Sequence, residues 1–305
     1  MQEPKIIKIK SISEYHRMMG LPQPEHPLIS IVDYSKIDMP ADGGLWSLVA
    51  DYYSISIKRG VGKMFYGQQE YDFDDGVMYC MAPKQVLRVV RPTDETIERS
   101  GWILLIHPDF LWGTALARNI KKYEFFDYSV NEALFLSEKE ETTINQIIQN
   151  IRQEYVANID KFSQDIMISQ IETLLNYTER FYQRQFITRK ISNHQVLDRL
   201  EALLNAHFES EDLMKKGLPA VQDIAGALNV SPSYLGSLLK VLTGQSTQQH
   251  IHNKLIEKAK EKLSTTALTV SEIAYELGFE HPQSFSKLFK TKTKVSPLEF
   301  RQSFN

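Results

Sequence analysis

The stretch EIAYELGFEHPQSFSKLFK, residues 272–290, contains two short amphipathic blocks with a glycine between them. Thr269 and Glu272 have the spacing of a capping box, which predicts the start of a helix. Gly278 can take the left-handed conformation that ends a helix, and Pro282 suits the first turn of the next one. Apolar residues recur at helical spacing on one side of both blocks: Ile273, Ala274, Leu277, Phe285, Leu288 and Phe289. The stretch therefore predicts a helix-turn-helix unit.

The same pattern occurs once before in the chain. Residues 223–228 (DIAGAL) correspond to residues 272–277 (EIAYEL) with an offset of 49, and residues 232–240 correspond to 282–290 with an offset of 50. Ser231 is the expected N-cap of the earlier second helix. An amphipathic stretch between the copies carries Ile251, Leu255, Ala259 and Leu263 on one stripe. This internal duplication predicts two helix-turn-helix units joined by a longer helix.

The second block leaves four polar side chains off the apolar face: Gln283, Ser284, Lys287 and Lys290. In a helix-turn-helix, the N-terminal part of the second helix meets base edges in the major groove. Gln pairs bidentately with adenine and Lys donates to guanine, whereas Lys290, further along, is expected to meet phosphate. The alternative is that all four are solvated surface residues. The duplication favours DNA contact.

The charge of the chain is divided unevenly. The net charge is -3, but residues 213–305 carry twelve Lys and Arg against seven Asp and Glu, a balance of +5, which leaves -8 for the rest. A basic part beside an acidic one is the pattern expected when one part meets a polyanion. The start of the chain lacks the apolar run of a signal peptide, and no apolar run is long enough to cross a bilayer. One cysteine, Cys80 in an apolar run, fits a buried thiol in a reducing cytoplasm.

Up to about residue 129 the sequence predicts strands. Residues 51–60 (DYYSISIKRG) alternate with a period of two, and two further apolar runs follow at 76–83 and 100–110. Asp75 and Gly76 predict a tight turn ahead of the first run. Several short strands separated by Gly, Pro and Asp turns indicate a sandwich or barrel.

Two helices are expected next. Ser137 and Glu140 form a second capping box, and the first helix continues with the stripe Ile144, Ile148, Ile151 and Tyr155. The second helix, about residues 161–182, carries Ile166, Ile171, Leu174 and Leu175. These stripes fit either an intramolecular core or a helix–helix contact between two subunits. The polar and basic residues 183–195 are interpreted as a linker.

The C-terminal hundred residues resemble the DNA-binding domain of the arabinose-operon (AraC/XylS-type) transcriptional regulators. The resemblance is carried by Ile224-Ala225-x-x-Leu228, Ser231, Tyr234-Leu235, Leu239-Lys240, Gly244-x-Ser246, Leu255, Ala259, Leu263, Ile273-Ala274-x-x-x-Gly278-Phe279, Ser284-Phe285-Ser286-Lys287-x-Phe289-Lys290, Ser296-Pro297 and Arg301.

That resemblance implies base-reading positions at Ser233, Gly236 and Ser237 in the first unit and at Gln283, Ser284 and Lys287 in the second. Lys240 is a further expected DNA contact, and Lys290 is the expected phosphate contact. The sequence departs from the family at Ser237, where a basic residue is usual. Thr247 stands in place of the proline of the first Gly-x-Ser-Pro turn, and Lys294 in place of the glycine of the second. The small side chains of the first reading helix indicate that it mainly holds phosphates.

The first 190 residues resemble more loosely the sensor part of such regulators, on residues 73–89, residues 104–114 and the helices after Leu136. The resemblance implies an α+β multidomain protein: a cupin-like sensor barrel at 1–130, a helical dimerisation connector at 131–190 and an all-α DNA-binding domain at 191–305. It implies a cytoplasmic, homodimeric regulator, an activator rather than a repressor, with double-stranded DNA and a small-molecule effector as partners. It also allows a contact with RNA polymerase. A ligand-independent regulator whose barrel only dimerises is the alternative.

An enzyme in the barrel is the hypothesis of a different class. Cupin-like barrels hold metals through clustered histidines, yet His107 has no other histidine near it in the sequence. His250 and His252 fall on an expected helix, where residues two apart point away from each other. We therefore expect no catalytic residues, no metal and no cofactor. A ligand pocket remains open, with Tyr53, Met64, Tyr66 and Tyr79 as its candidate lining, beside the alternative that these residues, with Tyr52 and Met81, only fill the barrel.

Overall fold

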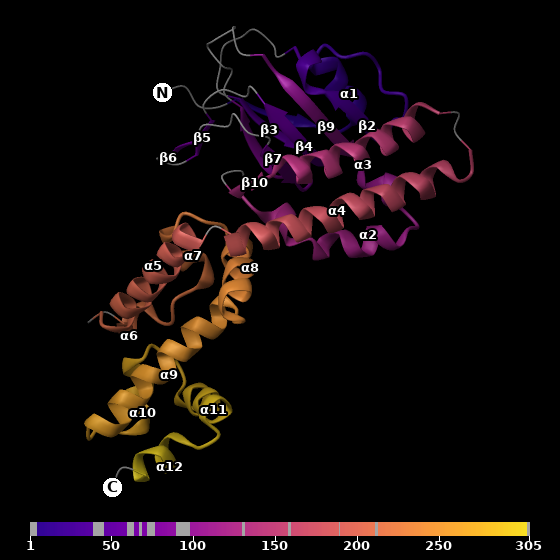
Figure 1. Cartoon of the computed structure of the whole chain (residues 1–305). Coiled ribbons are helices and arrows are strands. Elements are labelled where there is room, and N and C mark those ends of the chain that lie inside the picture. The colour runs from indigo at the N-terminus through magenta and orange to yellow at the C-terminus, as the bar shows by residue number, and fades with distance from the viewer. Residues whose placement is uncertain are drawn as a thin grey trace. The chain divides into compact units, whose positions relative to one another are not determined.

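The computed structural model describes residues 5–38, 46–59, 64–66, 69–71, 77–89, 98–129, 132–157, 160–188, 190–210 and 213–303. The chain divides into two compact units, Met1–Gln185 and Phe186–Asn305. The first unit combines strands with helices, and the second is helical (Figure 1). An α+β chain with a C-terminal helical domain is confirmed.

The first unit is built on two larger sheets and a hairpin. One sheet has the order β10-β7-β4-β9-β2 and is antiparallel throughout; its strands are β2 (Ile29–Asp33), β4 (Tyr53–Arg59), β7 (Val77–Met81), β9 (Ser100–Ile106) and β10 (Leu134–Phe135). The other sheet has the order β1-β3-β8, with β1 (Lys5–Ile9), β3 (Trp46–Ala50) and β8 (Val86–Val89). The hairpin pairs β5 (Met64–Tyr66) with β6 (Gln69–Tyr71).

The strands expected within residues 51–60, 76–83 and 100–110 are confirmed as β4, β7 and β9. The predicted turn at Asp75 and Gly76 lies outside the described residues. Strand β9 is buried without interruption from Trp102 to Ile106 because both faces of its sheet are covered. Cys80 on β7 is buried as expected, and burial raises the pKa of its thiol.

One face of the five-stranded sheet packs on an apolar cluster shared with the smaller sheet and with α1 (Ile12–Met18). The cluster includes Ile9, Ile12, Tyr15, Val32, Leu48, Tyr52, Ile103 and Leu105. The helices α3 (Glu138–Val156) and α4 (Ser163–Thr188) lie beside the sheet (Figure 1). The indole Nε1 of Trp102 donates to Asn145 Oδ1 of α3 at 2.8 Å, which joins α3 to β9.

The stripes of α3 and α4 are mostly intramolecular core. Ile144, Ile148 and Ile151 of α3 and Ile171, Leu174 and Leu175 of α4 are each at most 1% exposed within a single chain. The capping box of Ser137 and Glu140 is present as predicted. Ile166 departs from the expected stripe, because 45% of its surface is exposed. For the buried residues, core packing is the correct alternative.

Short elements connect β9 to α3: η2 (Pro108–Leu111), α2 (Ala115–Asn119), η3 (Ile120–Lys122) and η4 (Glu124–Asp127). Earlier, η1 (Tyr34–Lys36) follows β2. The boundary between the two units, after Gln185, falls within residues 183–195, where the linker was expected, but the described part of this stretch is helical. Helix α4 continues to Thr188 and α5 (Lys190–Phe208) begins two residues later, since this polar stretch contains neither proline nor glycine to end a helix.

The second unit contains α5, α6 (Leu213–Lys216), α7 (Val221–Ala227), α8 (Pro232–Thr243), α9 (Thr247–Thr265), α10 (Val270–Glu276), α11 (Pro282–Thr293) and α12 (Pro297–Gln302). Its core is one cluster to which both predicted copies contribute. Leu235 and Leu239 come from the first copy, and Phe285 and Phe289 come from the second; all four are fully buried.

Candidate functional site

The second helix-turn-helix consists of α10 and α11 and follows the predicted chemistry. Thr269 Oγ1 accepts from the Glu272 backbone N–H at 3.2 Å, and Glu272 Oε2 accepts from the Thr269 N–H at 2.6 Å. Gly278 ends α10 with φ +84°, and Pro282 is the first residue of α11. Phe285 and Phe289 hold the inner face of α11 in the core, so the opposite face is presented outward.

The four polar side chains of α11 lie on that outward face. Gln283, Ser284, Lys287 and Lys290 are all exposed. In the described part of the chain, no hydrogen bond or ion pair engages any of their side chains. Lys287 and Lys290 carry positively charged ammonium groups that donate hydrogen bonds, and Gln283 carries an amide. The face therefore offers the groups that recognise bases and phosphates.

The first helix-turn-helix consists of α7 and α8, and its outward face is different. Ser231 Oγ caps α8 by accepting from the Tyr234 N–H at 3.2 Å. Ser233 and Ser237 are partly buried, and Lys240 is exposed. With Gly236 beside them, these residues give α8 a short polar surface that ends in one lysine.

The two turns share a backbone pattern. Asn229 (φ 58°) in the first turn corresponds to Gly278 in the second, with the offset of 49. In each turn a backbone N–H donates back to an alanine carbonyl at 3.0 Å, from Val230 to Ala225 and from Phe279 to Ala274. Asparagine is the commonest non-glycine residue in this conformation. The sequence analysis did not identify Asn229 as the turn residue, although its type and offset were visible.

Helix α9 joins the two helix-turn-helix motifs of the second unit. Its 19 residues span about 28 Å at 1.5 Å per residue. At its C-terminal end Lys262 pairs with Glu276 of α10 at 2.7 Å, and Leu263 O accepts from Arg301 Nε of α12 at 3.2 Å. At its N-terminal end His250 Nε2 lies 2.9 Å from Thr243 Oγ1 of α8. Each helix-turn-helix is thus fixed to one end of a rigid spacer (Figure 1).

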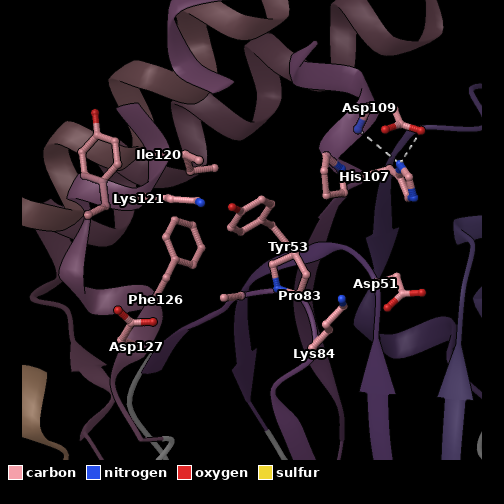
Figure 2. A pocket seen from close by; sticks show the side chains of 13 residues that line it. Asp51, Tyr53, Pro83, Lys84, His107, Asp109, Ile120, Lys121, Phe126 and Asp127 are labelled. Carbon is pink, nitrogen blue, oxygen red and sulfur yellow. Dashed lines mark hydrogen bonds and ion pairs between the residues drawn. The ribbon is translucent and has the colours of Figure 1, made fainter. Parts of the chain in front are cut away.

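A second candidate site is a cavity of about 770 Å³ in the first unit (Figure 2). It lies where β4, the turn after β7 and the end of β9 face η3 and η4. Aromatic and apolar side chains form part of the wall, including Tyr53, Pro83, Ile120, Tyr123 and Phe126. Charged and titratable side chains form the rest: Asp51, Lys84, His107, Asp109, Lys121 and Asp127.

The aromatic part of the wall is rigid. Tyr53 and Phe126 meet edge to face with ring centroids 5.0 Å apart, and the Tyr123 hydroxyl donates to Asn176 Oδ1 at 2.9 Å. Burial, with Asp127 as the second cause, raises the pKa of Tyr53, so its phenol stays protonated at neutral pH. His107 Nδ1 accepts from the Asp109 N–H at 3.3 Å, which fixes the imidazole ring at the edge of the cavity.

Of the four predicted pocket residues, the structure places Tyr53 in this cavity. Tyr79 on β7 is buried and does not line it. The side chains of Met64 and Tyr66 lie outside the described part. Tyr52, also considered, packs edge to face on Tyr15 in the core. The sequence analysis missed Asp51, Lys84, Lys121 and Asp127, which come from four separate segments and share no periodicity.

Histidine and acidic side chains do not gather into a metal site among the described residues. His250 and His252 lie on α9 and bond to different partners, Thr243 and Gln248. Burial lowers the pKa of both imidazoles. In the same part of the chain, no helix has the length and apolarity needed to cross a membrane.

Comparison with known proteins gives matches centred on the second unit. The sequence profile of a family described as "Helix-turn-helix domain" matches residues 224–303. The raffinose operon transcriptional regulatory protein of Pediococcus pentosaceus is 36% identical over 83 residues, which are 27% of this chain and 30% of that protein. The lactose operon transcription activator of Staphylococcus xylosus is 26% identical over 166 residues, covering 54% of this chain and 57% of that protein.

Among solved structures, a transcriptional regulator from Chromobacterium violaceum, described as having an AraC-type DNA-binding domain, is 21% identical with a TM-score of 0.33. The match covers 37% of this chain and 96% of that one. This chain spans half or less of the length of the first curated relatives it matches.

Proposed function

Because residues 224–303 are a helix-turn-helix domain of the AraC family of transcriptional regulators, we propose that this protein binds duplex DNA sequence-specifically and regulates transcription in response to a small molecule. The observation that carries the proposal is the outward face of α11. Three side chains suited to base contact, Gln283, Ser284 and Lys287, are exposed at its N-terminal part, while Phe285 and Phe289 on its other face are fully buried. The family is one of regulators and not of enzymes.

The spacer supports contact with two major grooves. Successive major grooves on one side of B-DNA are one turn, about 34 Å, apart. Helix α9 spans about 28 Å and fixes one helix-turn-helix at each end, so α8 and α11 can reach neighbouring grooves of one duplex. A single chain would therefore contact two half-turns of its site.

The two reading helices are proposed to contribute unequally. Gln283, Ser284 and Lys287 of α11 read bases, and Lys290 holds a phosphate. Ser233, Gly236 and Ser237 of α8 have little reach, so α8 mainly holds the backbone of the duplex through short hydroxyls and Lys240. Specificity would then be concentrated in the half-site that α11 occupies.

The remaining parts are proposed from the resemblance and the architecture. Residues 1–130 form a cupin-like sensor barrel, 131–190 a helical connector that dimerises the protein and 191–305 the DNA-binding domain. The apolar cluster shared by the two larger sheets of the first unit supports a sensing domain built from packed sheets. The protein works in the cytoplasm as a homodimer and activates transcription, with RNA polymerase as a further partner. An activator role is supported by the name of the Staphylococcus xylosus relative.

A DNase footprint on the DNA upstream of its own gene, joined to fluorescence anisotropy, tests the DNA-binding proposal. We expect protection of a discrete site. The logarithm of the binding constant should fall linearly with the logarithm of the salt concentration, because the protein releases counterions from the phosphates that it neutralises. Lys287→Ala should weaken binding to this site. Its matched control is Lys292→Ala, because an offset of five residues turns Lys292 to another side of α11 than Lys287. Protection no better than on random DNA at about 150 mM salt, with and without candidate effectors, would refute the proposal.

A further inference from the structure

The cavity of the first unit is lined by four charged side chains without a hydrogen-bond or ion-pair partner among the described residues. Asp51 lies just before β4, Lys84 in the turn after β7, Lys121 in η3 and Asp127 at the end of η4. In the described residues, none of these side chains makes a hydrogen bond or an ion pair. Two lysines and two aspartates line one cavity of about 770 Å³ without neutralising each other (Figure 2).

Their separation is set by the fold and not by side-chain choice. Each of the four residues comes from a different element, and the wall between them is built from Pro83, Ile120 and the edge-to-face pair of Tyr53 and Phe126. Lys84, Lys121 and Asp127 are exposed and Asp51 is partly buried, so these four charged side chains are accessible to a ligand that enters the cavity.

Lys84 is held by an unusual backbone. Its φ is 71°, in the left-handed region that a residue with a Cβ adopts at a cost. The Lys84 N–H donates to Ala50 O at 2.6 Å, so the strand before β4 fixes this turn. Strained backbone conformations that the surroundings enforce are concentrated at binding sites. This backbone conformation fixes the position from which the exposed Lys84 side chain lines the cavity.

The Tyr53 hydroxyl is the fifth polar group. It lies on the cavity wall, its side chain makes no hydrogen bond in the described chain, and its raised pKa keeps the proton available for donation. Together with the amines of Lys84 and Lys121 it forms a set of donors for a carboxylate. Asp51 and Asp127 form a set of acceptors for an ammonium group.

We propose that this cavity binds a small zwitterion with an apolar body, of the α-amino acid type. The carboxylate meets the lysines and the Tyr53 hydroxyl, the ammonium meets Asp51 or Asp127, and the body packs on Phe126 and Ile120. A hydrogen bond to a charged group is stronger than one between neutral groups. A zwitterion pairs both sets at once.

Other ligand classes satisfy the cavity less well. An anion without an ammonium leaves Asp51 and Asp127 unpaired and adds a further negative charge, and a cation leaves both lysines unpaired. A neutral polyol can hydrogen-bond to all five groups but neutralises none. These classes are the competing outcomes of the test.

The first test measures binding to the full-length protein by thermal shift and calorimetry. The probes are L-leucine, L-phenylalanine and L-tryptophan, with 3-phenylpropionate and 2-phenylethylamine as forms of phenylalanine that each lack one charge, and D-galactose as the polyol. We expect at least one amino acid to raise the melting temperature, because a ligand of the folded state stabilises it. Each single-charge form should bind at least tenfold more weakly than L-phenylalanine. Equal binding of either form, binding of galactose alone, or no amino acid with a Kd below about 10 mM would overturn the proposal.

The second test uses variants of the cavity. Lys121→Met and Lys84→Met should each weaken amino acid binding at least fivefold, and at least one of Asp51→Asn and Asp127→Asn should do the same. The matched control is Lys122→Met, since Lys122 is the neighbouring exposed lysine of η3 and does not line the cavity. The melting temperature without ligand shows that each variant is folded. Unchanged binding in both lysine variants would refute the site.

This inference rests on the effector part of the proposed function, and its failure can be told apart from failure of DNA binding. Amino acid binding is measured without DNA, and DNA binding is measured without amino acid. A protein that binds its operator but no zwitterion keeps the regulator proposal and loses this one. A protein that binds the zwitterion but no specific DNA does the reverse.

Discussion

Gly244 and Lys294 occupy the same left-handed backbone conformation at corresponding ends of the two reading helices. Their φ angles are 72° and 69°, and in both cases the backbone N–H donates to the carbonyl of a lysine four residues earlier, Lys240 or Lys290. The duplication therefore preserves the helix end even where the residue type changed. Glycine adopts this conformation without cost and lysine does not.

Replacing Lys294 by glycine should stabilise the second unit. Removing the strain of the left-handed conformation stabilises the folded state by about 1–2 kcal/mol. Glycine also gives the unfolded chain more conformational freedom, which offsets part of this gain, so the free energy of unfolding should rise by about 0.5–1 kcal/mol. All three tryptophans precede residue 113, so far-UV circular dichroism is the signal for urea unfolding of this helical unit. Gly244→Ala is the reciprocal variant and should be destabilised. A loss of stability in Lys294→Gly would contradict the assignment of strain.

Thr247 and Pro297 are the first residues of α9 and α12, again at corresponding positions. Thr247 is 3% exposed, and its Oγ1 has no hydrogen-bond partner among the described residues. The preceding residues, Ser246 and Ser296, have nearly the same extended conformation, with ψ of 161° and 159°, which is what a following proline requires.

Thr247→Pro should therefore stabilise the protein by about 1 kcal/mol, because it removes a buried unsatisfied hydroxyl and fixes a backbone already suited to proline. The same dichroism measurement tests it. Thr247→Val removes only the hydroxyl. If Thr247→Val raises the free energy of unfolding as much as Thr247→Pro does, the effect is due to the hydroxyl alone. A destabilised Thr247→Val would show that the Oγ1 has a partner in solution.

Lys287→Ala should lose discrimination at one base position of the DNA site, at a cost of about 1–3 kcal/mol for the cognate base. Lys290→Ala should instead weaken all sequences alike and reduce the salt dependence by about one phosphate. Anisotropy with a set of duplexes that vary one position at a time measures both. If Lys287→Ala weakened every duplex equally, Lys287 would be a phosphate contact.

Lys58 on β4 gives the first unit a dependence on pH. Its side chain is half-buried, its Nζ lies 5.4 Å from the centroid of the Tyr34 ring, and burial lowers the pKa to about 8. In the unfolded chain the pKa of Lys58 is near 10.4, so as the pH falls the unfolded chain is protonated before the folded one. The free energy of unfolding therefore decreases as the pH falls from about 10.4 to about 8, and this contribution is constant below that range.

Lys58→Met should consequently raise the free energy of unfolding at pH 7 by about 1–2 kcal/mol and flatten its change between pH 8 and 10. Tryptophan fluorescence follows this unit, because Trp102 pairs with Ile57 in the neighbouring strand. Identical pH profiles for the variant and the parent would show that Lys58 is solvated.

The helix-turn-helix units could be predicted almost to the residue because their determinants are local. Capping boxes, Gly278 and Pro282 act within a few positions, and the duplication repeats them. The strands β4, β7 and β9 were also visible in the sequence, whereas their order in the sheet depends on contacts between residues far apart in the chain. The helical stretch around residues 183–195 was missed because polar composition was given more weight than the absence of any helix-breaking residue.

The cavity could not be predicted for a different reason. Asp51, Lys84, Lys121 and Asp127 have no pattern in the sequence, and only the fold brings them to one space. Tyr53 was selected as an aromatic residue on a strand, a criterion that selected the core residue Tyr79 equally. The left-handed turn at Lys84 has no signal, because lysine is not a residue expected there.

Helices α5 and α6 decide how much chain a separately produced DNA-binding fragment needs. Leu200, Leu204, Phe208 and Leu213 belong to the same core as Phe285, and His207 Nε2 lies 2.9 Å from the carbonyl oxygen of Gly217, whose backbone lies against Gly278. A Cβ on Gly278 would lie 2.9 Å from the Gly217 carbonyl carbon, so this junction tolerates no added atom. An expression clone that starts at residue 221 retains both reading helices yet exposes the apolar side they rest on, and should aggregate; one that starts at residue 186 should be recovered folded.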